Sequence, residues 1–165
     1  MRIASRAICL IALAVCSGTS GTAAAENGAY ESVASLLTNY TKSERGDEII
    51  IGGSSSGTST VTKSTGSLFK EGSSSLMECI VFAKRSASGL DMEAPCTSTS
   101  SAGDKLFTLA RRKIGDVTAG STGEGKSEIT GVTGAYAGMT GSSTYKIDYL
   151  SANRAVSISK CEWRK

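Results

Sequence analysis

The chain has 165 residues and no histidine, and its 18 basic residues nearly balance its 15 acidic ones. This balance gives no electrostatic basis for binding nucleic acid or a membrane surface, so neither is predicted as a partner. The missing histidine excludes Ser-His-Asp triads, Cys-His pairs and histidine-ligated zinc or haem. We therefore predict no metal and no cofactor, and the many serines have no histidine to activate them.

Residues 1–25 have the pattern of a secretory signal peptide. Two arginines precede an apolar segment over residues 8–16, and Ala23-Ala24-Ala25 forms a small-residue cleavage site. The apolar run is too short to cross a bilayer, and no second one follows. We therefore expect an exported protein, periplasmic or secreted, without a transmembrane segment. Lipid attachment at Cys16 is the less favoured alternative, because a valine directly before the cysteine is unfavourable there.

Cleavage would leave residues 26–165 as a single domain, since this length suits one hydrophobic core. Without the two arginines, 16 basic and 15 acidic residues remain, a net charge of +1. Glycine is abundant, with 19 residues, whereas the chain has one proline. A composition rich in serine, threonine and glycine is typical of exported all-β proteins, in which order depends on β-pairing more than on a large apolar core.

The first half of this domain contains short apolar or β-branched segments separated by polar turns. Residues 29–40 fit either a short helix or a strand, and a strand is favoured for their second part. Residues 48–51 predict a short strand, residues 54–57 a flexible loop, and residues 58–64 a polar strand that faces solvent.

Residues 76–83 form the clearest predicted strand, but both of its faces are largely apolar. In one interpretation Glu78 and Phe82 point into an apolar interior, where burial would raise the pKa of Glu78 and suit it to acid–base chemistry. In the other, which is favoured, Cys79 and Val81 face inward and Glu78 lies in solvent. Glu78 is kept as a candidate polar anchor.

The second half of the domain continues the pattern and brings the expected number of strands to between seven and nine. Pro95 cannot donate a backbone hydrogen bond, so its strand should lie at an edge or contain a bulge. The basic run at residues 111–113 is interpreted as a solvated strand end, with an anion contact at a barrel rim as the alternative. The remaining predicted strands cover residues 90–97, 105–114, 128–132, 145–150 and 155–163.

Residues 131–145, Gly-Val-Thr-Gly-Ala-Tyr-Ala-Gly-Met-Thr-Gly-Ser-Ser-Thr-Tyr, predict a tight corner that feeds a β-strand. Glycine alone enters conformations with positive φ without a Cβ clash, and the segment has four glycines. Tyr136 is interpreted as a bulky plug across one end of the core. A phosphate cradle is disfavoured, because no helix start follows and no Lys-Ser/Thr ends the loop.

This corner resembles the "GGTGKYAGITGSGTY" motif of bacterial secreted proteins related to the allene oxide cyclase barrel, within the lipocalin-like (calycin) group. Residues 103–107, Gly-Asp-Lys-Leu-Phe, resemble the "DGDKIF" strand start of the same proteins. The chain departs from the motif at Val132 and Ala135. The resemblance covers residues 79–150 and implies an all-β, single antiparallel up-and-down β-barrel of about eight strands. It carries over no catalytic residue.

Three cysteines remain after cleavage, and in an oxidising compartment we expect one disulfide and one free thiol. Cys79 and Cys96 lie where many members of the resembled family carry a cysteine pair, and a turn joins their two predicted strands. This pairing is favoured, and pairings of either cysteine with Cys161 stay open. The bridge would stabilise the fold by about 2–4 kcal/mol.

These features predict an exported β-barrel of undefined role that binds a small apolar or amphipathic ligand, since a barrel of about eight strands can hold one small molecule. One alternative, by family analogy, is a cyclase- or isomerase-like enzyme acting on an oxidised lipid. Another is a structural or partner-binding surface protein that uses residues 58–64 as an exposed strand edge. No catalytic residue is assigned, and no oligomeric state is predicted. The candidate lumen residues are Glu78, Phe82, Phe107, Tyr136, Tyr145 and Tyr149.

Overall fold

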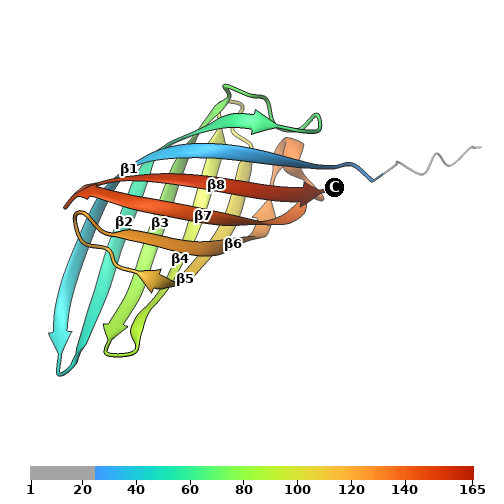
Figure 1. The fold of residues 1–165 in the computed structure, drawn as a ribbon. Coiled ribbons are helices and arrows are strands. Elements are labelled where there is room, and N and C mark those ends of the chain that lie inside the picture. Colours follow the sequence, from blue (N-terminus) through green and yellow to red (C-terminus); the bar gives the residue numbers. More distant parts are fainter. Residues whose placement is uncertain (1–24) are drawn as a thin grey trace, which may run out of the picture.

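The computed structural model describes residues 25–165, and these residues form a closed barrel of eight antiparallel strands. Each strand pairs with the next one in sequence, and β8 returns to pair with β1 (Figure 1). The predicted all-β up-and-down barrel is therefore confirmed. The predicted signal peptide, apart from Ala25, and Cys16 lie outside the described residues. The strands are β1 (Asn27–Arg45), β2 (Glu48–Ser64), β3 (Ser74–Ser86), β4 (Gly89–Ser100), β5 (Lys105–Gly115), β6 (Thr122–Val132), β7 (Thr140–Ser151) and β8 (Arg154–Arg164), with a 3-10 helix, η1 (Gly134–Tyr136), between β6 and β7.

Strands β1 and β2 are longer than the sequence pattern predicted. Residues 29–40 contain no helix, and residues 54–57 continue β2 instead of forming a loop. The glycine of this segment allows close backbone approach: a Cβ on Gly57 would lie 1.9 Å from the Ser35 carbonyl oxygen of β1. The apparent loop composition therefore reflects tight pairing of two long strands.

Barrel closure leaves no strand at an edge, which corrects two expectations. Pro95 lies inside the sheet between β3 and β5: it pairs with Leu109 of β5, and the β3–β4 pairing is interrupted around it, between Cys79–Cys96 and Phe82–Glu93. Residues 58–64 pair with β1 and most of them also face β3 or its preceding loop, so they are not the exposed edge that the surface-protein alternative required.

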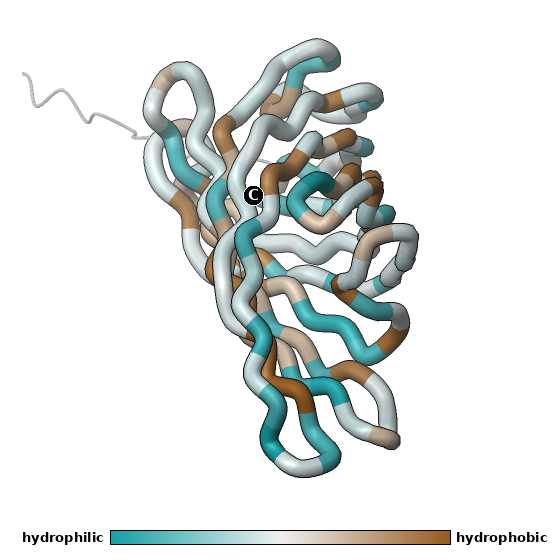
Figure 2. The backbone as a smooth tube through the Cα atoms, turned by 90° about the vertical axis from the view of Figure 1, so that its left-hand side faces the viewer, coloured by the Kyte–Doolittle hydropathy of each residue, from teal (hydrophilic) through white to brown (hydrophobic). Residues whose placement is uncertain are grey.

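The barrel has two distinct ends. The hairpin end carries the turns β1–β2, β3–β4, β5–β6 and β7–β8, and the first two of these hairpins project furthest in Figure 1. The terminal end carries the start of β1, the C-terminus, the β2–β3 loop (residues 65–73) and the predicted glycine corner with η1. Figure 2 shows that hydrophobic and hydrophilic positions are interspersed along the strands, as expected where alternate side chains face the interior. None of the described residues form a helix with the length and apolarity that crossing a membrane requires.

The two stretches that carry the family resemblance lie against each other at the terminal end. The Lys105 backbone N–H donates to Thr133 Oγ1 at 2.8 Å, and the Ala135 N–H donates to Asp104 Oδ1 at 3.2 Å. Gly134 has φ +60°, and a Cβ there would lie 1.6 Å from Asp104 Oδ1. The corner therefore needs glycine both for its backbone conformation and for the space that Asp104 occupies.

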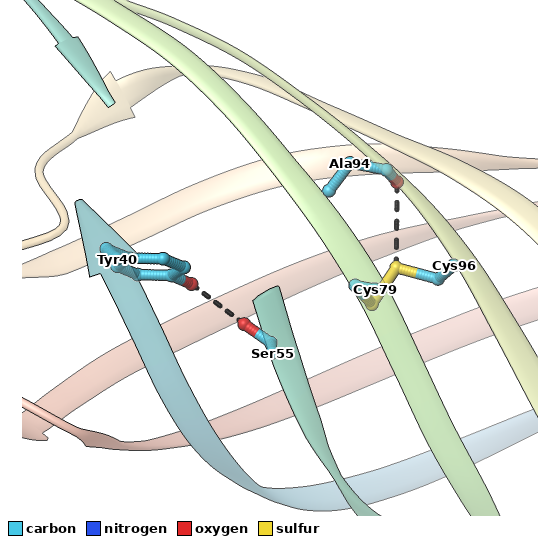
Figure 3. Close-up of a disulfide and its surroundings, with 5 residues drawn as sticks. All are labelled: Tyr40, Ser55, Cys79, Ala94 and Cys96. Atoms are coloured by element: carbon cyan, nitrogen blue, oxygen red, sulfur yellow. Dashed lines mark hydrogen bonds between the residues drawn. A yellow bond between two sulfur atoms is a disulfide. The ribbon is translucent and has the colours of Figure 1, made fainter. Parts of the chain in front are cut away.

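The predicted disulfide is confirmed. Cys79 on β3 and Cys96 on β4 face each other in register with their Cα atoms 4.1 Å apart, and Figure 3 shows the bridge. Both cysteines are buried, which fixes the inward face of β3. Cys161, the remaining cysteine of residues 25–165, is free and buried.

Candidate ligand-binding lumen

The barrel interior contains two adjoining cavities. The inner cavity, of about 90 Å³, lies on the hairpin side, and the outer cavity, of about 600 Å³, extends to the loops of the terminal end. Because several side chains border both, the two cavities adjoin inside the barrel, and together they are called the lumen here. The shared lining residues are Met77, Thr108, Ser127, Ser143, Ser157 and Ser159.

Apart from Met77, the positions that border both cavities carry small hydroxyl side chains, which leave space in the middle of the barrel. An eight-stranded barrel with bulky residues at these positions would be filled. The side chains of this zone are small, and each serine can donate and accept a hydrogen bond, so the zone is also polar. Some hydroxyls already have a backbone partner, as with Ser157 Oγ, which donates to the Lys146 carbonyl oxygen at 3.1 Å.

Arg112 borders the inner cavity and is 3% exposed. Its Nη2 lies 3.0 Å from both the Asp116 carbonyl oxygen and Tyr149 Oη, and its Nε lies 3.2 Å from Met92 Sδ. The guanidinium carbon also lies 5.5 Å from the centre of the Tyr149 ring, a cation–π distance. Nη1 has no hydrogen-bond partner. The Asp116 carboxylate pairs with Arg85 instead, so no carboxylate among the described residues neutralises Arg112.

The local sequence of β6 makes room for this arginine. A Cβ on Gly123 would lie 1.4 Å from Arg112 Nη1, and a Cβ on Gly125 would lie 2.6 Å from Tyr145 Oη. The two glycines face the lumen at alternate positions of the strand and leave space for the two large polar side chains. The β5–β6 register also shifts between Arg111 and Ile114, next to the arginine.

Three tyrosines surround the inner cavity, and burial raises the pKa of two of them. Burial raises the pKa of Tyr145 to about 12, and burial raises the pKa of Tyr149 further, although the charge of Arg112 opposes this. Tyr40, the third, meets the Tyr149 ring edge-on at 6.3 Å and shares a 2.8 Å hydrogen bond with Ser55 (Figure 3). The Tyr145 hydroxyl is buried and has no partner.

Aromatic side chains gather at the terminal end, where the outer cavity begins. Phe69 of the β2–β3 loop stacks on Tyr136 with ring centres 5.4 Å apart, and it also packs against Tyr30 and Trp163. Phe69, Tyr136 and Tyr30 line the outer cavity. Burial raises the pKa of Tyr136 and of Tyr30. Many serines also line the outer cavity, and Lys70 is the one charged residue among the described residues that line it.

Three of the six predicted lumen residues line the cavities. Tyr145 and Tyr149 border the inner cavity, and Tyr136 borders the outer one, as the predicted plug at one end of the core. Their role in binding stays a prediction.

The other three predicted lumen residues point outward. Glu78 is exposed and Phe82 is 59% exposed, because Cys79 and Val81 occupy the inward face of β3. Phe107 lies on the outer face of β5, where a Cβ on Gly131 would touch its ring at 3.3 Å, while its neighbours Leu106 and Thr108 line the outer cavity. The favoured interpretation of Glu78 as a solvent residue is confirmed.

Sequence reasoning missed Arg112, Tyr40 and the inward serines. The basic run was interpreted as solvated, and this holds for Arg111, which is exposed and pairs with Glu93 at 2.7 Å. Thr108, Ala110 and Arg112 are alternate residues of β5, so the two-residue period of a strand places all three side chains on the same face. This spacing could have indicated that Arg112 points inward. The alternative of an anion contact stays a prediction, and Arg112 lies inside the barrel instead of at its rim.

No family model matches the chain, and no curated protein matches it. Among solved structures, the chain is similar to a pterocarpan synthase dirigent protein at 15% sequence identity, with a TM-score of 0.42 over 84% of this chain and 89% of that one. This similarity is too distant to identify a family. The barrel that the sequence resemblance implied is present, and the family named by that resemblance stays a prediction.

Proposed function

We propose that this chain is an exported β-barrel protein that binds one small apolar or amphipathic molecule in its lumen. The observation that carries the proposal is that two adjoining cavities occupy the barrel from the aromatic rim to the Arg112 end. The outer cavity, of about 600 Å³, lies within the usual range of small-molecule sites, roughly 300–1,000 Å³. Its lining combines aromatic and aliphatic side chains with many serine hydroxyls, which suits a ligand with both apolar and polar parts.

Export is supported by the signal-peptide pattern of residues 1–25 and by the disulfide, which persists in oxidising compartments. We propose the periplasm or the extracellular medium as the location. Intact-mass analysis of the protein purified from its exporting cell would show cleavage after Ala25, or a lipid on Cys16 if the alternative holds. Retention of residues 1–25 in the exported protein would contradict the proposal.

The lumen does not favour the enzymatic alternative. A cyclase or isomerase would need a carboxylate to converge with a second polar group on the substrate. Within residues 25–165, neither cavity is lined by an aspartate or a glutamate, and Glu78 lies on the outer face. Binding without acid–base chemistry is therefore the proposed activity.

The binding proposal is tested by placing a large side chain at an inward position of β7 and, as a control, at the neighbouring outward position. Ser143 faces inward and borders both cavities, whereas Ser142 beside it is on the outer face of β7 and borders neither. We expect Ser143→Phe to weaken binding of N-phenyl-1-naphthylamine, a neutral fluorescent apolar probe, by more than about tenfold, because the ring occupies the passage. Ser142→Phe adds the same side chain outside and should bind like the wild type.

The extra ring costs about 1–3 kcal/mol of stability where a core is well packed, so folding of both variants is checked by circular dichroism. If Ser143→Phe fails to fold, Ser143→Val narrows the same passage with a smaller group. Equal probe binding by an inward variant and by Ser142→Phe would contradict binding in the lumen.

A further inference from the structure

Arg112 is a buried cation whose charge the protein leaves uncompensated. A buried charge is ordinarily paired, because removing it from water is costly. Arg112 has a carbonyl oxygen, a phenol and a thioether as partners, and the acidic residue that it contacts, Asp116, offers only its backbone. The side chain of Asp116 is committed to Arg85 and to the Val117 N–H.

The arginine also has unused donor capacity: Nη1 packs against Gly123 of β6, and the side chain as a whole borders the inner cavity. The guanidinium carries five N–H groups, and none on Nη1 has a partner. The same side chain lines the inner cavity, where Tyr145 Oη is also buried and unpaired. Two unsatisfied polar groups bordering one cavity are the arrangement expected where a ligand completes the hydrogen bonding.

The size and charge of the inner cavity limit what this ligand part is. A single water needs on the order of 10–15 Å³ of such space, so about 90 Å³ holds a small headgroup but no bulky ring system. Arg112 is the one charged residue among the described residues that line this cavity, so it matches a single negative charge. Arginine also presents a planar fork that fits the two oxygens of a carboxylate.

Resting on the lumen-binding function proposed above, we propose that the ligand is an amphipathic carboxylate whose headgroup binds Arg112, with Tyr145 as a second hydrogen-bond partner. The apolar part then passes the serine-lined middle and reaches the aromatic side chains of the terminal end. This assigns Arg112 as the specificity-determining residue and the outer cavity as the site of the apolar tail.

The test compares a carboxylate and an alcohol of the same chain length. Dodecanoate and 1-dodecanol are each used to displace N-phenyl-1-naphthylamine from the wild-type protein. We expect dodecanoate to bind about ten- to hundredfold more tightly, the range that a charge-assisted hydrogen bond supports. In Arg112→Met, which keeps an apolar chain of similar reach, dodecanoate should lose that advantage while 1-dodecanol binds as before. Arg111→Met, the exposed neighbour, is the matched control and should change neither affinity.

Different failures have different meanings. Equal binding of the two compounds by the wild type, or an equal effect of Arg112→Met and Arg111→Met, would overturn the carboxylate assignment and leave lumen binding intact. If neither compound nor the probe binds the folded wild type, the lumen-binding function itself fails. If Arg112→Met does not fold, Arg112→Lys keeps the charge without the fork, and it should weaken dodecanoate alone; unchanged dodecanoate binding in this variant would overturn the assignment.

Discussion

Removing the disulfide should cost a large part of the stability of this barrel. Cys79 and Cys96 are separated by 17 residues, so the bridge closes a short loop in the unfolded chain. Loop-closure entropy for this length gives about 3 kcal/mol at room temperature. Domains of this size are stable by about 5–15 kcal/mol, so the loss should be plain in any unfolding experiment.

The measurement is urea-induced unfolding, followed by circular dichroism, of the oxidised protein, the reduced protein and Cys79→Ala/Cys96→Ala. Reduction keeps both sulfur atoms in the core and so isolates the cross-link, whereas the double variant adds the effect of two small cavities. The dependence on urea should steepen without the bridge, since the unfolded chain then exposes more surface. Cys161→Ala is the control, because it removes a buried thiol that forms no bridge.

We expect the reduced protein to lose about 3 kcal/mol and the double variant somewhat more. A difference below about 1 kcal/mol between oxidised and reduced protein would refute the reasoning, because the loop-closure contribution would then be absent. A thiol assay adds a qualitative check: the oxidised protein should expose one reactive thiol in denaturant and resist labelling when folded.

Two further perturbations follow from the lumen. Gly123→Ala should destabilise the barrel by about 1–3 kcal/mol, because its Cβ would lie 1.4 Å from Arg112 Nη1. Gly52→Ala, with open space around its Cβ, should change stability little. Urea-induced unfolding measures both variants, and similar losses of stability would contradict the predicted crowding at Gly123. Burial holds the Tyr145 phenol neutral with a pKa of about 12, above the ordinary value of 10, so the folded state keeps its proton where the unfolded state loses it. The stability that this group contributes is thus complete below pH 10 and is lost as the pH rises toward 12. The free energy of unfolding, measured at several pH values, should therefore decline less over that range in Tyr145→Phe than in the wild type. An identical decline in both proteins would argue against a buried phenol at Tyr145.

The sequence predicts the barrel well because its strongest signals are local and repeated. Alternating segments, glycine turns and the 131–145 corner each indicate a strand or a connection by themselves. The extra length of β1 and β2 has no local signal, since residues 54–57 have the composition of a loop. Only pairing with β1 on one side and β3 on the other makes them a strand.

Which face of a strand lines the lumen is harder to predict. A two-residue period groups side chains by face but does not say which face is inside. On β3 both faces are apolar, and Leu76, Ile80 and Phe82 are exposed in the barrel although they have the composition of a core. Cys79 was the better guide, because a disulfide-bonded cysteine in this position is buried. The site residue Arg112 depends on the space left by Gly123, a relation between two strands that a pattern along one strand does not contain.

The position of Trp163 has a practical consequence for testing the proposed ligand binding. It is the one tryptophan of the chain, it is buried, and its indole N–H has no partner. It touches Phe69, whose ring borders the outer cavity. A molecule that displaces Phe69 on entry would alter the surroundings of the indole, so the emission spectrum of the unlabelled protein is a built-in indicator of occupancy. Extracts from the source cell can thus be fractionated by their effect on this emission, even before the compound has been identified.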